Sequence, residues 1–144
     1  MTLQDITPDN YRDLPQIPFA DVKLLWHDNF WDGPLSGLLL WRNERLWFQM
    51  QEEYEPPGGV EPVPWPWYRR FLVIRLTAGQ LGEEEQWHEL FRRCVGTHTD
   101  YRHDETTEPA TVHPKEQWAE FYDAYNRRVP PNLSANEVVG WFER

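Results

Sequence analysis

The pattern of hydrophobic and polar residues changes along the chain, from a period of two to a period of about three and a half. Between residues 21 and 77, apolar side chains alternate with polar ones or form short runs, which is typical of β-strands. After Thr77, apolar residues recur at helical spacing. The pattern therefore predicts an α+β fold, in which an antiparallel sheet of about four strands (residues 21–77) is covered by two amphipathic helices.

The segment 38–50 predicts a β-hairpin, because two apolar runs flank the polar stretch Arg42-Asn43-Glu44-Arg45. Asn tolerates a positive φ, so we expect a tight turn centred on Asn43-Glu44. If Trp41 pairs with Leu46, both faces of the hairpin are apolar near the turn, whereas an antiparallel sheet often has one polar face. We therefore expect another layer or a partner to cover the second face, which carries Leu38, Leu40 and Trp47.

The predicted helices span about residues 80–95 and 114–128. We expect Glu83, Glu84 and Glu85 in the first turn of the first helix and Gly96 as its C-terminal cap. The end of the chain is ambiguous. Ser134 and Glu137 have the spacing of a capping box, which favours a short helix, but Val138-Val139-Gly140-Trp141-Phe142 could equally form a last strand. The apolar stripes of the two long helices are Trp87, Leu90, Phe91, Cys94 and Val95, and Trp118, Phe121, Tyr122 and Tyr125.

Length and aromatic content predict a single domain over residues 1–144, since 15% of the residues are aromatic and can build a large core. Residues 1–20 are expected to be an irregular lead-in, because Pro8, Pro15 and Pro18 interrupt any helix. Residues 52–66 contain five prolines, two glycines and four glutamates. That composition predicts a long, acidic, partly polyproline-like loop.

The net charge of −10 narrows the class of partner. It opposes direct contact with nucleic-acid phosphates and favours a protein partner, especially a basic one. No apolar run is long enough for a membrane helix and the N-terminus lacks a signal-peptide pattern, so we expect a cytoplasmic protein without a membrane partner. Cys94 alone cannot form an intramolecular disulfide. The sequence leaves open whether the chain forms a homodimer.

The proline-rich loop predicts a surface for protein binding. Indoles on a stiff loop can enter a partner's pocket, and proline lowers the entropy lost on binding. The alternative is that Trp65 and Trp67 lie back over the sheet and cover its second apolar face. Arg69 and Arg70, like Arg127 and Arg128, are expected to form solvated ion pairs. The predicted partner-binding residues are Trp65, Trp67, Tyr54, Glu55 and Glu61.

The first hypothesis is thus a small non-enzymatic protein-binding module of the inhibitor, immunity or adaptor type. The alternatives are a small-ligand binder with a Trp-rich pocket and a metal-dependent hydrolase or lyase that uses the loop 97–113. The alternative to that metal site is a solvated loop, because its spacing matches no established metal motif. No cofactor is predicted besides this divalent metal. Its candidate ligands are His98, Asp100, His103 and His113.

A second candidate polar site comprises His27, Asp28 and Asp32, near the end of the first strand. Neighbouring carboxylates would raise the pKa of the imidazole towards the range of a general base. The alternative is a turn in which the aspartates bond to their own backbone. No nucleophile elbow, phosphate loop or dinucleotide fingerprint occurs in the chain.

Overall fold

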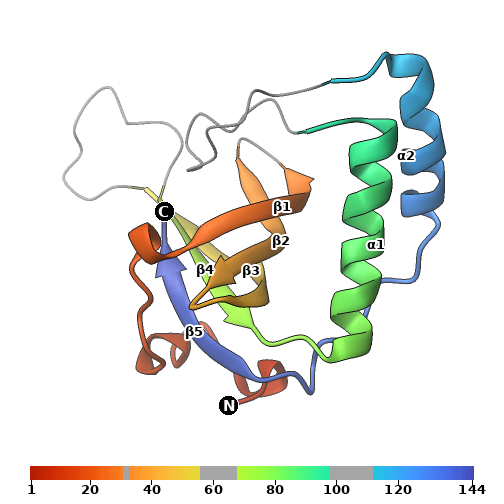
Figure 1. Cartoon of the computed structure of the whole chain (residues 1–144). Coiled ribbons are helices and arrows are strands. Elements are labelled where there is room, and N and C mark those ends of the chain that lie inside the picture. The colour runs from red at the N-terminus through yellow and green to blue at the C-terminus, as the bar shows by residue number, and fades with distance from the viewer. Residues whose placement is uncertain (31–32, 56–67, 98–111) are drawn as a thin grey trace. The chain divides into compact units, whose positions relative to one another are not determined.

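The computed structural model describes residues 1–30, 33–55, 68–97 and 112–144 (Figure 1). These residues form two compact units. Met1–Leu76 and Leu133–Arg144 make up the sheet unit, and Thr77–Asn132 make up the helical unit. The single domain predicted from the sequence stays a prediction. No helix within the described ranges is long and apolar enough to span a membrane.

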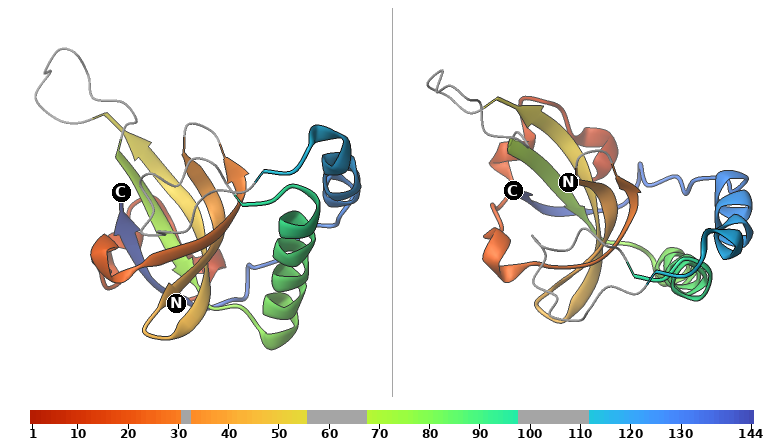
Figure 2. Two further views of the ribbon diagram at one scale, coloured as in Figure 1. Left: turned by 45° about the horizontal axis from the view of Figure 1, so that its top comes forward. Right: turned by 90° about the horizontal axis from the view of Figure 1, so that it is seen from above.

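The sheet unit contains a five-stranded antiparallel sheet in the order β1-β2-β3-β4-β5 (Figures 1 and 2). The predicted α+β class is confirmed, but the sheet has five strands where about four were predicted, and four of the five lie between residues 21 and 77. The fifth strand comes from the C-terminal segment, where we favoured a helix, and that preference is wrong. The strands are β1 Lys23–Phe30, β2 Pro34–Trp41, β3 Glu44–Tyr54, β4 Tyr68–Ile74 and β5 Val138–Glu143.

Long-range contacts explain why the C-terminal segment is a strand. It supplies the backbone partners of β4, and it places Phe142 in the core, where its ring stacks on Phe71 at 4.9 Å. Glu137 does not close a capping box but instead pairs with Arg75. The unpaired edge of β4 thus outweighs the local helix signal.

Both faces of the sheet are buried, as the two apolar faces of the hairpin predicted. Trp26, Leu38 and Trp47 on one face are at most 6% exposed. The opposite face carries the hydrophobic core cluster, so apolar side chains on both faces of the sheet are removed from water. The core cluster comprises Ile17, Val22, Leu24, Leu39, Leu46, Phe48, Phe71, Val73 and Phe142.

The N-terminal lead-in is built into the sheet unit. It contains the 3₁₀-helices η1 Leu3–Asp5, η2 Tyr11–Asp13 and η3 Phe19–Asp21. The backbone N–H of Ile17 donates to the carbonyl of Trp141 at 2.7 Å, and the N–H of Trp141 donates to the carbonyl of Pro15 at 3.1 Å. The fully buried Tyr11 packs edge-on against Trp141. The lead-in therefore covers the outer edge of β5.

The β2–β3 turn consists of Arg42 and Asn43, which have φ values of 50° and 62°. Trp41 pairs with Glu44, so the predicted turn centre is wrong by one residue and the partner of Trp41 by two. A shift of two residues preserves the faces of a strand, because side chains alternate with a period of two. The predicted faces are consequently correct although the register is not.

Gly37 in β2 allows β1 to approach closely. A Cβ atom at this position would lie 1.9 Å from the carbonyl oxygen of Trp26 and 2.6 Å from the Cα atom of His27. Real Cβ atoms are not found that close to backbone atoms, so only glycine fits without a shift of one strand.

The helical unit contains α1 Ala78–Cys94 and α2 Trp118–Asn126, and the short 3₁₀-helix η4 Lys115–Gln117 precedes α2. An α-helix is present at each of the two predicted places, but α2 is shorter than the predicted 114–128. Thr77 caps α1, because its hydroxyl accepts from the Gln80 N–H while the Gln80 side chain accepts from the Thr77 N–H. The expected position of Glu83–Glu85 in the first turn is therefore wrong. The cap at Gly96 is confirmed by its φ of 115° and its N–H bond to Phe91.

The aromatic stripes of the two helices pack against each other. Phe91 meets Phe121 edge-on at 5.2 Å, and Trp87 meets Tyr125 in the same way at 5.2 Å. The helical unit therefore has an apolar seam of its own. The packing of the helices onto the sheet stays a prediction.

Candidate partner-binding site

Several residues that the sequence singled out lie outside the described ranges, and their roles stay predictions. These are Trp65, Trp67 and Glu61 of the proline-rich loop, Asp32, and the loop residues His98, Asp100 and His103. The described candidates are Tyr54, Glu55, His27, Asp28 and His113.

The β3–β4 hairpin ends in three cross-strand pairs, Glu52 with Arg70, Glu53 with Arg69 and Tyr54 with Tyr68. Residues 52–54 therefore belong to β3 and not to the loop, contrary to the sequence prediction. The signal was present in the sequence, because Glu-Glu-Tyr before the loop is complementary to Tyr-Arg-Arg after it. Opposite charges and aromatic pairs in register stabilise antiparallel strands.

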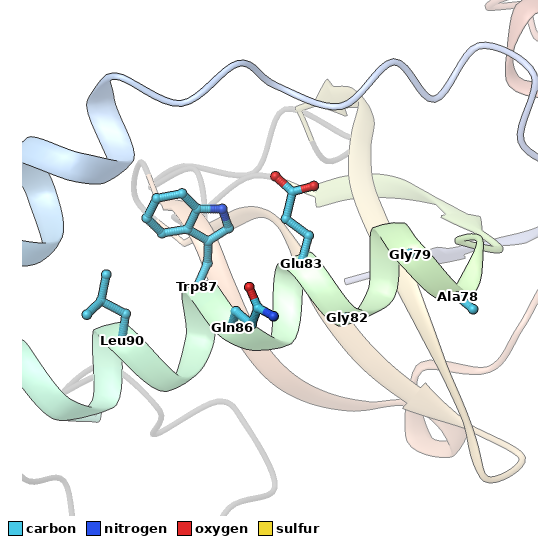
Figure 3. A pocket seen from close by; sticks show the side chains of 7 residues that line it. All are labelled: Ala78, Gly79, Gly82, Glu83, Gln86, Trp87 and Leu90. Atoms are coloured by element: carbon cyan, nitrogen blue, oxygen red, sulfur yellow. The ribbon is translucent and has the colours of Figure 1, made fainter.

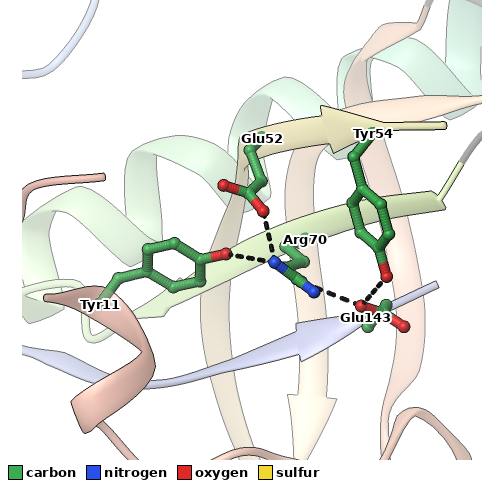
Figure 4. A network of polar contacts seen from close by, with 5 residues as sticks. All are labelled: Tyr11, Glu52, Tyr54, Arg70 and Glu143. Atoms are coloured by element: carbon green, nitrogen blue, oxygen red, sulfur yellow. Dashed lines mark hydrogen bonds and ion pairs between the residues drawn. The ribbon is translucent and has the colours of Figure 1, made fainter. Parts of the chain in front are cut away.

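Arg70 lies at the centre of a polar network on β3, β4 and β5 (Figure 4). Its guanidinium contacts Glu52 Oε1 at 2.5 Å and Glu143 Oε2 at 2.9 Å, and it donates to the Tyr11 hydroxyl at 3.2 Å. The Tyr54 hydroxyl also donates to Glu143, at 2.5 Å. We call these five residues the Arg70 network. It connects three strands and the lead-in, so it holds the end of the sheet in a fixed geometry.

The contacts of the Arg70 network also raise the pKa values of Arg70 and Tyr54. Burial opposes the charged guanidinium, but hydrogen bonds with Tyr11 and Glu143 outweigh it and raise the pKa of Arg70. Burial and the hydrogen bond to Glu143 raise the pKa of Tyr54. At pH 7 the guanidinium is thus charged and the phenol neutral, and the guanidinium lies 4.3 Å from the centre of the Tyr54 ring.

Arg69 forms the corresponding pair with Glu53, at 2.5 Å. The Arg69 side chain is only 7% exposed. The expectation of solvated ion pairs is therefore wrong for Arg69, and Arg70 is also largely buried. Two of the four glutamates assigned to the acidic loop are neutralised by strand partners.

Aromatic and acidic side chains lie next to these ion pairs, at the end of the β3–β4 hairpin. Tyr68 is 42% exposed, and its ring centre lies 5.5 Å from that of Tyr54. Glu55, the next residue of the chain after β3, is exposed. We call Tyr54, Glu55 and Tyr68 the hairpin-end surface. This surface combines exposed aromatic rings with a carboxylate, and the strand ends that carry it are held by the ion pairs of Arg69 and Arg70.

The structure places His27 in a different environment from the one expected. The side chain is buried, and burial together with the charge of Arg144 lowers the pKa of His27 to about 3, whereas we expected it to rise. Its ring packs on Phe30 at 5.0 Å. Asp28 accepts a hydrogen bond from the Ser36 hydroxyl across the β1–β2 pair. The site with Asp32 stays a prediction.

Of the four predicted metal ligands, only His113 lies within the described residues. Its backbone N–H donates to Val95 at 2.8 Å, and its carbonyl accepts from the Trp118 indole at 2.8 Å. Among the described residues, no group of three or more His, Cys, Asp or Glu side chains could hold a metal ion. The other three candidate ligands lie outside those residues, so the metal site stays a prediction.

Comparison with known proteins adds no functional assignment to the hairpin-end surface. No family model, curated protein or solved structure matches the chain. Function is therefore inferred from the chemistry of the described side chains.

Proposed function

We propose that this protein is a small non-enzymatic protein-binding module that engages its partner through the hairpin-end surface and the acidic, Trp-containing segment after it. The observation that carries the proposal is the exposed Tyr68 ring, whose centre lies 5.5 Å from that of Tyr54, a member of the Arg70 network. Tyrosine supplies a large contact area with little rotamer entropy to lose, and Tyr, Trp and Arg are the side chains that dominate protein interfaces.

The rigid support of the hairpin-end surface favours this role. The Tyr54 hydroxyl is held by Glu143, and its ring is covered by the Arg70 guanidinium. A side chain that is ordered before binding loses less entropy on association. The Arg70 network would therefore present the hairpin-end surface in one conformation.

Charge supports a basic partner. Glu52, Glu53 and Glu143 are paired with arginine, whereas the exposed Glu55 follows the strand directly and Glu61 lies further along the sequence. The whole chain carries −10. Carboxylates around an aromatic centre favour lysine and arginine on the opposing surface.

The experiment replaces Tyr68 with a photoreactive phenylalanine derivative, irradiates the protein in an extract of its source cells and identifies the adduct by mass spectrometry. Tyr122 on α2 is the matched control site, because it is 41% exposed and Tyr68 is 42% exposed. We expect a discrete adduct at position 68 and none of the same mass at position 122.

The purified partner then permits calorimetry. Tyr68→Ala and the double change of Trp65 and Trp67 to Ala should each weaken binding about tenfold or more, and Tyr122→Ala less than about twofold. Unchanged melting temperatures would show that the fold is intact. Equal adducts at positions 68 and 122, or equal affinities of the Tyr68→Ala and Tyr122→Ala variants, would contradict the proposal.

A further inference from the structure

One face of α1 is hollowed along much of its length, and the lining residues within the described part of the chain all belong to this helix (Figure 3). Its volume is about 610 Å³, which is within the usual range for ligand sites. Positions three, four and seven residues apart lie on the same face of a helix, so the lining follows from the helical repeat. The lining includes Ala78, Gly79, Gly82, Glu83, Gln86 and Trp87.

The helix itself does not require the glycines of this hollow. The glycines with positive φ in the described residues are Gly33 and Gly96, and a Cβ at Gly79 or Gly82 would meet no atom within 4 Å. Glycine within a helix nevertheless destabilises it by about 0.5–1 kcal/mol relative to alanine. The absence of two side chains leaves the α1 backbone accessible along the floor of the hollow.

A fixed indole and a carboxylate adjoin this floor. Trp87 is held by edge-on contacts with Tyr125 at 5.2 Å and Phe121 at 6.3 Å. Glu83 lies one helical turn earlier, and Figure 3 shows both side chains projecting from the same side of α1. Glu83 makes no hydrogen bond or ion pair within the part of the chain that is described, whereas Glu84 is buried and pairs with Arg128 at 3.0 Å.

We propose that this hollow binds an arginine side chain from a basic segment of a partner protein. A guanidinium can lie on the face of an indole and bond to a carboxylate at the same time, and its planar shape suits both contacts better than an ammonium group. The apolar stem of arginine would lie along the floor at Gly79 and Gly82. This site shares no residue with the hairpin-end surface, and the net charge of −10 on the whole chain favours a cationic guest.

The experiment titrates the ¹⁵N-labelled full chain with acetyl-Gly-Arg-Gly-amide and follows the amides of Gly79 and Gly82 and the indole N–H of Trp87 by NMR. The matched control peptide carries citrulline, which has the shape of arginine but no charge. We expect saturable shifts at these three groups with the arginine peptide, and shifts at least about fivefold smaller with the citrulline peptide.

Two variants separate binding from folding. Glu83→Gln should weaken binding roughly fivefold, whereas Glu89→Gln removes the same charge from an exposed position of α1 outside the lining and should change it less than about twofold. Gly82→Ala should weaken binding while raising the melting temperature, since alanine favours the helix.

Unsaturable or equal shifts with the two peptides, or equal effects of the two glutamate changes, would overturn the inference. The test uses no natural partner, so its result is independent of the hairpin-end surface.

Discussion

Burial divides the charged residues of this protein into groups with different roles. Arg69 and Glu84 are buried and paired with opposite charges, whereas Glu55 and Glu83 lie at the surfaces to which we assign binding. An ion pair that excludes water fixes geometry, and a solvated carboxylate adds charge without ordering its surroundings. His27 represents a further case, in which a buried group loses its charge.

His27 should make stability depend on pH. Its pKa is about 3 in the folded protein and about 6.5 when unfolded, so only the unfolded chain takes up this proton between those values. The stabilisation is complete above about pH 6.5 and decreases as the pH falls towards 3. Between pH 6.5 and 5, the free energy of unfolding should fall by about 1.5 kcal/mol more in the native protein than in His27→Gln.

Urea denaturation at several pH values measures this difference. Most carboxylates stay ionised above pH 5, so the comparison isolates the imidazole. Parallel pH profiles of the two proteins would show that His27 is protonated equally in the folded and unfolded states, contrary to its burial.

At the scale of elements, matched side chains connect segments that are distant in sequence. The Arg70 network joins β3, β4, β5 and the lead-in (Figure 4). In the helical unit, Glu84 of α1 pairs with Arg128, which follows α2 and covers the Tyr125 ring at 4.0 Å. Each connection combines charge with an aromatic face, so it constrains direction as well as distance.

Arg128→Met should destabilise the protein by about 2–3 kcal/mol, because it leaves the carboxylate of Glu84, whose side chain is 2% exposed, without its guanidinium partner. Arg127→Met is the matched control and should cost less than about 0.5 kcal/mol, because Arg127 is exposed. Replacing Glu84 and Arg128 together by Met should recover much of the loss. Denaturant titrations measure all three, and equal losses for Arg127→Met and Arg128→Met would contradict the role of the pair.

At the scale of the whole molecule, the net charge of −10 is the property most relevant to association. A field of one sign raises the encounter rate with an oppositely charged partner, and salt screens it. If the partner is basic, as proposed, the association rate should fall about tenfold between roughly 0.05 and 0.5 M salt, with a smaller change in the dissociation rate. Stopped-flow binding measures both rates. A salt-independent association rate would argue against a basic partner.

Local patterns in the sequence were sufficient to predict whether most segments form strands or helices. The strand-like apolar pattern between residues 21 and 77, which includes the hairpin, predicted β1 to β4, and the two helical stripes predicted α1 and α2, because period and turn chemistry act within a few residues. The complementary triplets around the loop also showed in the sequence where β3 and β4 pair, although the prediction placed residues 52–54 in the loop.

The remaining features depend on contacts between distant residues, which no local pattern encodes. The final segment became β5 because β4 had a free edge, and the lead-in covered that strand in turn. The pKa of His27 fell because folding removed it from water, an effect that its acidic neighbours in sequence do not reveal. The sequence by itself thus determined the nature of most elements and the charge that the molecule carries. Only the tertiary structure decided which charges are buried and paired, because burial is a property of packing between segments.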